Sequence, residues 1–321
     1  MTEASPPALP APVRRGRALG CLALVAGIYL AALWYVDRDK QILSQLSTLA
    51  GPLCGCAALV LTSYVVRYQR WYSVLRRQGY RVLWHRGFAA YLAGFAFTAS
   101  PGKAGELLRI RYFLRLGVPA RVTLTTFVYE RALDLLIITG LGAGAATLIP
   151  LFGIFAGIVL GLLLVLCALA FSPWLQARMA VLMGYLPGAR LPRLACFFLD
   201  GAIALRPLLT PRLTLISALY GTAAWLLTAL AFAWLAHSVG VTLPSHYAVA
   251  IYPLAMLIGA LSFVPGGVGT TEAAIVLMLS AAGAGVDVGL TVAVGIRLAS
   301  LWLAVAVGMV AMATLEARQV A

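Results

Sequence analysis

The sequence reads FAFTASPGKAGE at residues 95–106 and ALSFVPGGVGTTE at residues 260–272. In each stretch a short apolar run ends in Pro-Gly-x-x-Gly, a glutamate follows, and another apolar run comes after it. Arg131 lies twenty-five residues beyond Glu106, and Arg297 lies twenty-five residues beyond Glu272. Interrupted hydrophobic segments in corresponding halves of a chain point to the binding site of a transporter. We therefore predict an internal repeat with a binding site at the two interruptions.

The composition places the whole chain in a membrane. Hydrophobic residues make up 62% of the 321 residues, charged residues make up 11%, and the mean hydropathy is +0.96. A soluble domain of this length could not bury so much apolar surface. Several runs also exceed the roughly eighteen apolar residues that read as a transmembrane helix. We predict an all-α polytopic membrane bundle.

The apolar runs give a layout along the chain. We predict spans at residues 18–36, 46–66, 122–149, 151–171, 213–239 and 288–315, after a cytoplasmic tail at residues 1–17. The interrupted stretches at residues 88–114 and 248–282 have halves too short to cross a bilayer, which predicts re-entrant helical hairpins. Residues 174–212 hold charges among apolar residues and are expected to form an interfacial connector with amphipathic helices. The first span is expected to be a retained signal anchor.

The basic residues predict the orientation. The net charge is +14, but most of the 24 Lys and Arg residues lie between apolar runs, where they set orientation and meet anionic headgroups, so we expect no nucleic-acid partner. With both termini in the cytoplasm, the outer side keeps only Arg38 and Lys40. If the first interrupted stretch crossed the membrane, the arginines from Arg109 to Arg121 would lie outside, against the positive-inside bias. The two hairpins therefore enter from opposite sides, which makes the repeats inverted.

Seven ionisable residues are expected at membrane depth: Lys103, Glu106, Glu130, Arg131, Asp134, Glu272 and Arg297. Each would cost about 2.5 to 3.5 kcal/mol at a helix centre without a partner. Arg131 can reach Asp134 at i,i+3, and Glu130 shares a helix face with Asp134 at i,i+4. Two interpretations stay open: a structural ion-pair network that fixes helix packing, or a polar path that binds a lipid headgroup.

The Pro-Gly turns add a candidate anion site. Proline fits the first turn of a helix, so the second half of each hairpin is expected to begin near Gly102 or Gly266. Its free N–H groups would then face the membrane interior and favour a phosphate, assisted by Lys103, Arg131 and Arg297. Gly105 and Gly269 would allow close backbone approach. The alternative is that these glycines only permit tight packing of the hairpins.

Other residues are given structural roles. Arg67, Arg70, Arg76 and Arg77 alternate with aromatic residues, and we interpret them as an anchor at the cytoplasmic interface rather than as a headgroup site. The five cysteines show no metal-ligand spacing, so we expect no metal and no cofactor.

Three blocks carry a resemblance to a known family: PGKAGELLR at residues 101–109, ERALD at residues 130–134 and PGGVGTTEAA at residues 265–274. They resemble the signature blocks of the lysylphosphatidylglycerol synthase transmembrane (flippase-like) family, over nearly the whole chain after the tail. The resemblance implies a bacterial or archaeal inner-membrane protein. In multiple peptide resistance proteins the equivalent region is regarded as a lipid flippase fused to a soluble aminoacyl transferase, and stand-alone members are associated with hopanoid or polyisoprenoid lipids.

The family pattern carries over to the following residues: Lys103, Glu106, Arg109, Glu130, Arg131, Asp134 and Glu272. Arg297 comes from the repeat alone. Because the sequence stops at Ala321, shortly after the last predicted span, we expect that lysyl transfer is not an activity of this chain. We expect an inner-membrane translocase for a polar or anionic lipid, such as an aminoacylated phospholipid, a polyisoprenoid phosphate or a hopanoid.

Two alternatives belong to other classes of protein. A lipid phosphatase or transferase could use Ser100, Thr270 or Thr271 as a nucleophile, although no histidine or carboxylate-rich metal motif is near them in the sequence. A non-transporting scaffold could recruit a lipid-synthesis enzyme through the Arg-rich loops.

Overall fold

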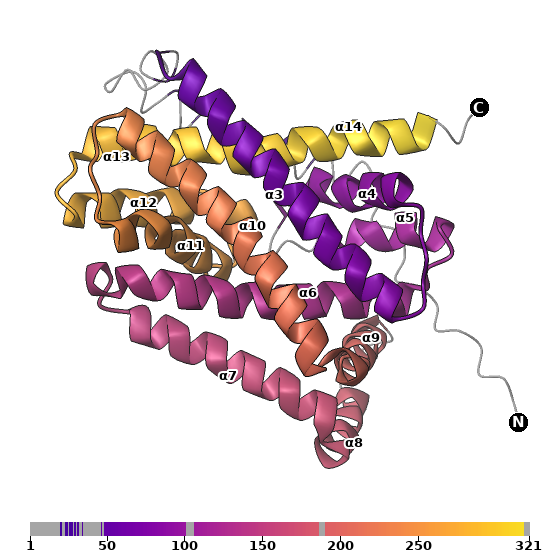
Figure 1. Ribbon diagram of the computed structural model, residues 1–321. Coiled ribbons are helices and arrows are strands. Elements are labelled where there is room, and N and C mark those ends of the chain that lie inside the picture. The colour runs from indigo at the N-terminus through magenta and orange to yellow at the C-terminus, as the bar shows by residue number, and fades with distance from the viewer. Residues whose placement is uncertain are drawn as a thin grey trace, which may run out of the picture.

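The protein is a bundle of helices (Figure 1). The structure is a computed structural model, and it describes residues 48–100, 106–185 and 190–317 together with isolated positions between 20 and 46. Within these residues all regular secondary structure is helical. The predicted all-α membrane bundle is therefore confirmed for the described part of the chain. The tail at residues 1–17 and most of the predicted first span lie outside the described residues.

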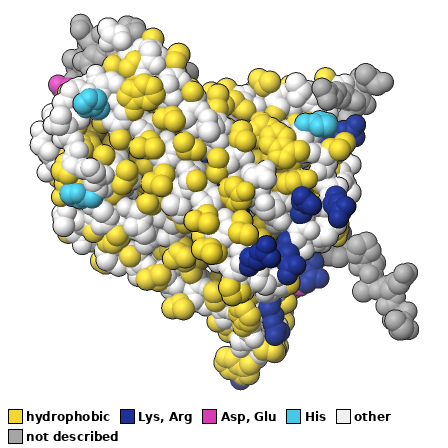
Figure 2. All heavy atoms as spheres, in the orientation of Figure 1, with side chains coloured by type: hydrophobic (Ala, Val, Ile, Leu, Met, Phe, Trp, Pro, Cys, Tyr) yellow, Lys and Arg dark blue, Asp and Glu magenta, His cyan; other side chains and the backbone are white. Residues whose placement is uncertain are grey.

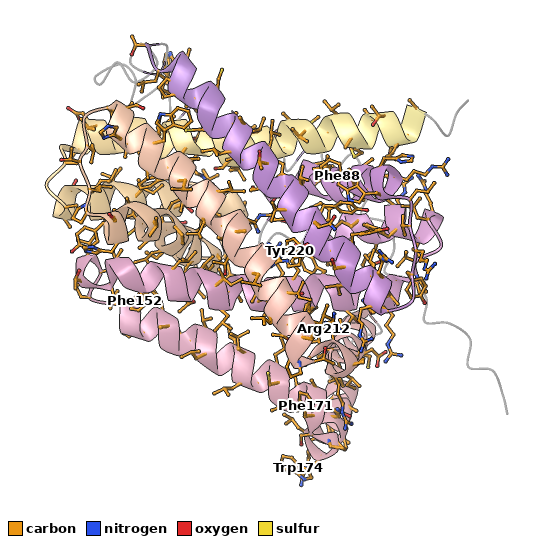
Figure 3. The ribbon with its side chains drawn as sticks, in the orientation of Figure 1. Phe88, Phe152, Phe171, Trp174, Arg212 and Tyr220 are labelled. Carbon is orange, nitrogen blue, oxygen red and sulfur yellow. The ribbon has the colours of Figure 1, made fainter. Side chains whose placement is uncertain are left out.

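Within the described part of the chain, five helical segments are long and apolar enough to cross a membrane. They are α3 (Ala50–Arg77), α6 (Ala120–Gly142) continued by the 3-10 turn η3 (Ala143–Leu148), α7 (Phe152–Phe171), α10 (Pro211–Ser238), and the segment Val286–Ala317. The last consists of α13 (Val286–Arg297), a π-helical turn η6 (Leu298–Trp302) and α14 (Leu303–Ala317). Figure 3 shows Phe152 and Phe171 at the two ends of α7.

The end of α3 differs from the prediction. The sequence predicted a span that stops at residue 66, but the helix continues to Arg77. Most of the added turns are buried: Arg67 and Arg70 are buried, and Tyr68 and Trp71 are almost fully buried, whereas the last two residues, Arg76 and Arg77, are exposed. The helix continues because the two arginines find acidic partners on α6, which removes the cost of burying their charge.

The second interrupted stretch consists of two short helices, α11 (Ser245–Leu261) and α12 (Thr270–Ala281), joined by a turn that contains η5 (Pro265–Gly267). Gly266, Gly267 and Gly269 all have positive φ angles, of 63°, 63° and 82°, which glycine adopts without steric cost. The interruption at Pro265-Gly266 is present as predicted. The following helix does not start where it was predicted. It begins at Thr270 rather than near Gly266, because the left-handed glycines delay the first helical turn.

The first interrupted stretch has a comparable layout. It begins with α4 (Trp84–Ala93) and the 3-10 turn η1 (Gly94–Phe97), and it returns through α5 (Arg109–Arg115). The predicted turn at Pro101-Gly102, with Lys103 and Gly105, lies outside the described residues. Residues 99 and 100, just before this turn, are described. Ala99 packs against Gly266 of the second turn, since a Cβ added at Gly266 would be 3.2 Å from the Cα of Ala99. The residues that lead into the first interruption therefore contact the second interruption.

Figure 1 shows α4 and α5 at the end of the bundle where α3 finishes, and α11 and α12 at the opposite end. The arginine and lysine side chains visible in Figure 2 gather at the first of these ends. The exposed surface between the ends is rich in apolar side chains, as a lipid-facing surface requires (Figure 2). The re-entrant course of the two stretches and their inverted relation stay predictions.

The connector between α7 and α10 is helical. It contains α8 (Pro173–Gly184), α9 (Arg190–Ile203) and the short turn η4 (Arg206–Leu208). Ser172 caps α8, since its hydroxyl accepts a hydrogen bond from the backbone N–H of Leu175 at 3.3 Å. α9 packs against α6, α7 and α8, so this connector closes one side of the bundle. Its predicted place at the membrane interface stays a prediction.

Candidate functional site

One turn of α6 forms the centre of a buried charged cluster. Glu130 and Asp134 are nearly inaccessible to solvent and lie one helical turn apart. Between them Arg131 lies 3.2 Å from Asp134 and 3.4 Å from Glu130. The predicted i,i+3 pair is therefore present. Three charges on one turn could not be buried unless other helices supplied cations.

α3 supplies two of those cations. Arg70 contacts both acids, with 2.9 Å to Glu130 and 2.9 Å to Asp134. Arg67 lies 3.3 Å from Asp134, and its guanidinium stacks over the ring of Trp225 on α10 at 4.6 Å. The interpretation of Arg67 and Arg70 as interfacial anchors is wrong, because both side chains are committed to the cluster.

Arg109 adds a third cation at the start of α5. It lies 3.2 Å from Glu106 and 3.3 Å from Glu130. Its guanidinium lies over the ring of Tyr91 at 4.1 Å, and the Tyr91 hydroxyl donates to Glu130 at 3.0 Å. Gly94 leaves room for this side chain, since a Cβ there would collide with it. Arg109 is thus almost fully buried inside the bundle, among the residues predicted to form the site.

A second charged group sits at the other interruption. Arg297, at the end of α13, donates from Nε to Glu272 at 2.8 Å and from a terminal nitrogen to the carbonyl of Gly266. The second oxygen of Glu272 accepts from the backbone N–H of Gly269 at 2.8 Å. Glu272 therefore caps its own helix and holds the turn to α13. The N–H of Gly269 is therefore already used by the carboxylate and is not available to a phosphate.

A cavity of about 100 Å³ separates the two charged groups. Four charged side chains line it: Arg67, Glu106 and Arg131 from one group, and Arg297 from the other. The backbone of Gly266 and the hydroxyl-bearing residues Ser63, Tyr64, Thr98, Thr228, Tyr252 and Ser300 also contribute to its wall. The cavity therefore lies where the two interrupted stretches meet, and it is lined by more cations than anions.

The π-helical turn η6 faces this cavity. Tyr64 donates to the backbone carbonyl of Ser300 at 3.1 Å, and Tyr252 donates to the Ser300 hydroxyl at 2.9 Å. Turns of this kind are frequent at functional sites, and in an apolar environment each backbone group that they free needs another partner. Two tyrosine hydroxyls from other helices thus support the wide turn next to Arg297.

The charge of the combined site is unbalanced. Within the described part of the chain it contains five arginines, Arg67, Arg70, Arg109, Arg131 and Arg297, and four carboxylates, Glu106, Glu130, Asp134 and Glu272. The Nε atom of Arg131 is buried and has no hydrogen-bond partner among the described residues. The Nε1–H of Trp225, which also lines the cavity, likewise has no hydrogen-bond partner among the described residues. One surplus positive charge and these two unused donors make the cavity suited to a small anion. The carboxylates contact arginines, and no metal-binding group of His, Cys, Asp or Glu occurs in the part of the chain that the structure describes.

The predicted site residues divide into three sets. Glu106, Arg109, Glu130, Arg131 and Asp134 come together in one cluster, and Gly266, Gly269, Glu272 and Arg297 come together in the other. Gly102, Lys103 and Gly105 lie outside the described residues. Sequence reasoning missed Arg67 and Arg70, although a signal was present: both continue the buried helix face of Val60, Ser63 and Tyr64 at intervals of three and four residues.

Comparison with known proteins supports the resemblance found in the sequence. The model of the family described as the lysylphosphatidylglycerol synthase TM region matches residues 18–308. No curated protein matches the chain. The matched range contains both interrupted stretches and every charged residue of the site.

Proposed function

Because the chain belongs to the family of the lysylphosphatidylglycerol synthase transmembrane region, and because its bundle encloses a cationic cavity, we propose that it translocates an anionic or polar-headed lipid between leaflets. The observation that carries this proposal is the position of the cavity. Three arginines and the turn at Gly266 surround it, and both interrupted stretches border it. A phosphate-bearing headgroup there would neutralise the surplus charge and accept from Arg131.

The size of the cavity sets a condition on the mechanism. A volume of about 100 Å³ holds a group such as a phosphate, but it is below the roughly 300 to 1,000 Å³ of pockets that enclose whole ligands. The two interrupted stretches must therefore move apart while a larger headgroup passes, and the acyl chains stay in the lipid. Movement of one stretch at a time would open the site to each side in turn.

The orientation belongs to the same proposal. We place both termini on the cytoplasmic side of a bacterial inner membrane. The end at which arginine side chains gather supports this orientation, because cytoplasmic segments carry an excess of Lys and Arg (Figure 2). α14 finishes at that same end (Figure 1).

An enzymatic role has less support. The Thr270 hydroxyl donates to the carbonyl of Gly267 at 3.1 Å and lies 3.1 Å from Ser262, so it is already used in the turn. A nucleophile needs a base within hydrogen-bond reach. A phosphate-release assay on phospholipid substrates, run beside the transport assay, separates the two functions.

Transport is tested in proteoliposomes that contain a fluorescent phospholipid with an anionic headgroup. We expect the wild-type protein to expose the inner-leaflet lipid to an external quencher faster than empty liposomes do. The Arg131→Gln variant should be at least about tenfold slower, because it loses a charge-assisted contact to the headgroup. The control is Arg111→Gln, which changes a 40% exposed arginine outside the cavity and should translocate at the wild-type rate.

Two outcomes would contradict the proposal. If the wild-type protein moves none of a panel of anionic and zwitterionic lipids, it is not a translocase. If Arg131→Gln and Arg111→Gln are equally active, the cavity is not the path that the headgroup takes.

A further inference from the structure

A second, larger cavity lies at the end of the bundle where arginine side chains gather. Its volume is about 560 Å³, within the range of pockets that enclose whole small ligands. The last turn of α3, the first turns of α6 and the segment around η4 form its walls. The lining residues are Arg77, Gln78, Tyr80, Arg121, Val122, Thr125, Ala204, Pro207 and Leu208. This cavity shares no residue with the central one.

The charge in this cavity is positive and not neutralised. Arg77 and Arg121 are both exposed, and neither forms an ion pair with a described residue. No acidic residue is among the described residues that line the cavity. α6 begins here at Ala120 with no acidic residue in its first turn and no side-chain cap. The positive end of its dipole therefore adds to the two guanidinium groups.

The walls of the cavity are held in place by hydrogen bonds. The amide of Gln78 donates to the hydroxyl of Thr126 at 2.8 Å and thereby joins the end of α3 to α6. The Thr125 hydroxyl donates to the carbonyl of Arg121 at 2.8 Å. The second bond lies within α6, so the Gln78–Thr126 bond is the one that joins the two arginine-bearing helix ends before any ligand arrives, and such preorganisation lowers the entropic cost of binding.

The depth of the cavity indicates which ligand it meets. Three candidate spans end around it: α3 finishes at Arg77, α6 starts at Ala120 and α10 starts at Pro211, directly after η4. Figure 3 shows Arg212 at this beginning of α10. Helix ends of this kind lie in the headgroup layer of a membrane, where lipid phosphates occur. The apolar wall residues Val122, Pro207 and Leu208 suit the glycerol part of a phospholipid.

We propose that this cavity binds a phosphate ester, with Arg77 and Arg121 as its two cationic ligands, at a site separate from the central one. A phospholipid headgroup in the adjacent leaflet is the source that the depth favours. Water-soluble phosphate esters have the same chemistry and are distinguished by the experiment. The binding measurement needs no transport, so it stands whether or not the protein translocates lipid.

The experiment measures lipid retained by the full-length protein in native mass spectrometry. The probes are phosphatidylglycerol, diacylglycerol without phosphate, and soluble glycerol phosphate as competitor. We expect wild type to retain phosphatidylglycerol and not diacylglycerol. Retention should fall about tenfold in the Arg77→Gln/Arg121→Gln variant, as expected for two partly exposed charge contacts. The Arg77→Lys/Arg121→Lys variant should keep most of the binding.

The matched control is Arg76→Gln/Arg115→Gln. These arginines are equally exposed but lie over Tyr72 and Tyr112, at 5.7 and 5.8 Å, and do not line the cavity. Equal loss in the control variant, or no loss in the Arg77/Arg121 variant, would overturn the proposal. Competition by glycerol phosphate at low concentration would assign the site to a soluble ester, and its failure to compete would assign it to lipid; both agree with a phosphate site.

Discussion

The Glu130→Leu variant is expected to lose about 3 to 5 kcal/mol of its free energy of unfolding, the cost of removing one partner from a buried ion pair. Glu130 accepts from the Tyr91 hydroxyl at 3.0 Å and contacts Arg70, Arg109 and Arg131 at 2.9 to 3.4 Å. Its loss leaves two buried guanidinium groups, those of Arg70 and Arg109, and the half-buried one of Arg131 with fewer carboxylates. Unfolding in mixed micelles with increasing SDS measures the effect.

Two further variants test the cause. Glu316→Leu removes a carboxylate that lies 3.9 Å from a partly exposed arginine, and it should cost at most about 1 kcal/mol. The double variant Glu130→Leu/Arg70→Leu removes one charge of each sign, so it should be more stable than Glu130→Leu alone. If the losses of unfolding free energy from Glu130→Leu and Arg70→Leu instead add up in the double variant, the Glu130–Arg70 pair does not stabilise the cluster.

The double variant also separates the two interpretations of the intramembrane charges. A network that only fixes helix packing predicts that a folded Glu130→Leu/Arg70→Leu protein still moves lipid at the wild-type rate. A headgroup path predicts a folded protein with impaired transport, because Arg131 and Arg67 would no longer be held at the cavity wall by the same partners.

The Gly308→Ala variant is expected to be destabilised by about 3 kcal/mol, the upper end of the range for overpacking. Gly308 of α14 lies directly against η1: an added Cβ would be 2.6 Å from the carbonyl carbon of Phe95 and 2.8 Å from the Cα of Ala96. These are backbone atoms and cannot move aside by changing a rotamer. The methyl group must therefore push α14 away from η1, which carries Phe95 of the central cavity. Thermal unfolding in detergent measures the loss.

Gly161→Ala is the matched control. It makes the same substitution in α7, where an added Cβ would have no atom within 4 Å. Alanine is favoured over glycine within a helix by about 1 kcal/mol, so this variant should be slightly more stable than wild type. If Gly308→Ala and Gly161→Ala change the thermal stability in the same direction and by the same amount, contact with η1 is not the cause of the destabilisation.

The sequence predicted what depends on local pattern and membrane thickness. Run lengths placed α6, α7, α10 and the final long segment close to their observed bounds. The Pro-Gly motif placed the break between α11 and α12, and the repeat singled out Glu272 and Arg297, which the structure shows in direct contact. Both inferences work because lipid leaves a spanning chain few alternatives to long helices and partnered charges.

What the sequence could not predict depends on contacts between helices. Arg70 lies near the end of an apolar run, as an interfacial arginine does. Its spacing on α3 continues the buried face, but only the contacts with α6 identify Glu130 and Asp134 as its partners. The start of α12 at Thr270 depends on Glu272 accepting from Gly269 while it also binds Arg297. Such choices between local and tertiary partners have no periodic signal in the sequence.

The surplus arginine of the central cavity has an electrical consequence. Moving one elementary charge across a membrane changes the free energy by about 2.3 kcal/mol per 100 mV of potential. When the empty site, with its net positive charge, switches from facing one side of the membrane to facing the other, the free energy of that step depends on the voltage. When a monoanion occupies the site, the net charge is zero and the step does not depend on the voltage. Voltage should therefore act on the return of the unloaded protein, and potassium–valinomycin gradients across proteoliposomes measure that dependence. Rates that stay constant from zero to 100 mV, under conditions where the return step limits turnover, would contradict this assignment of charge.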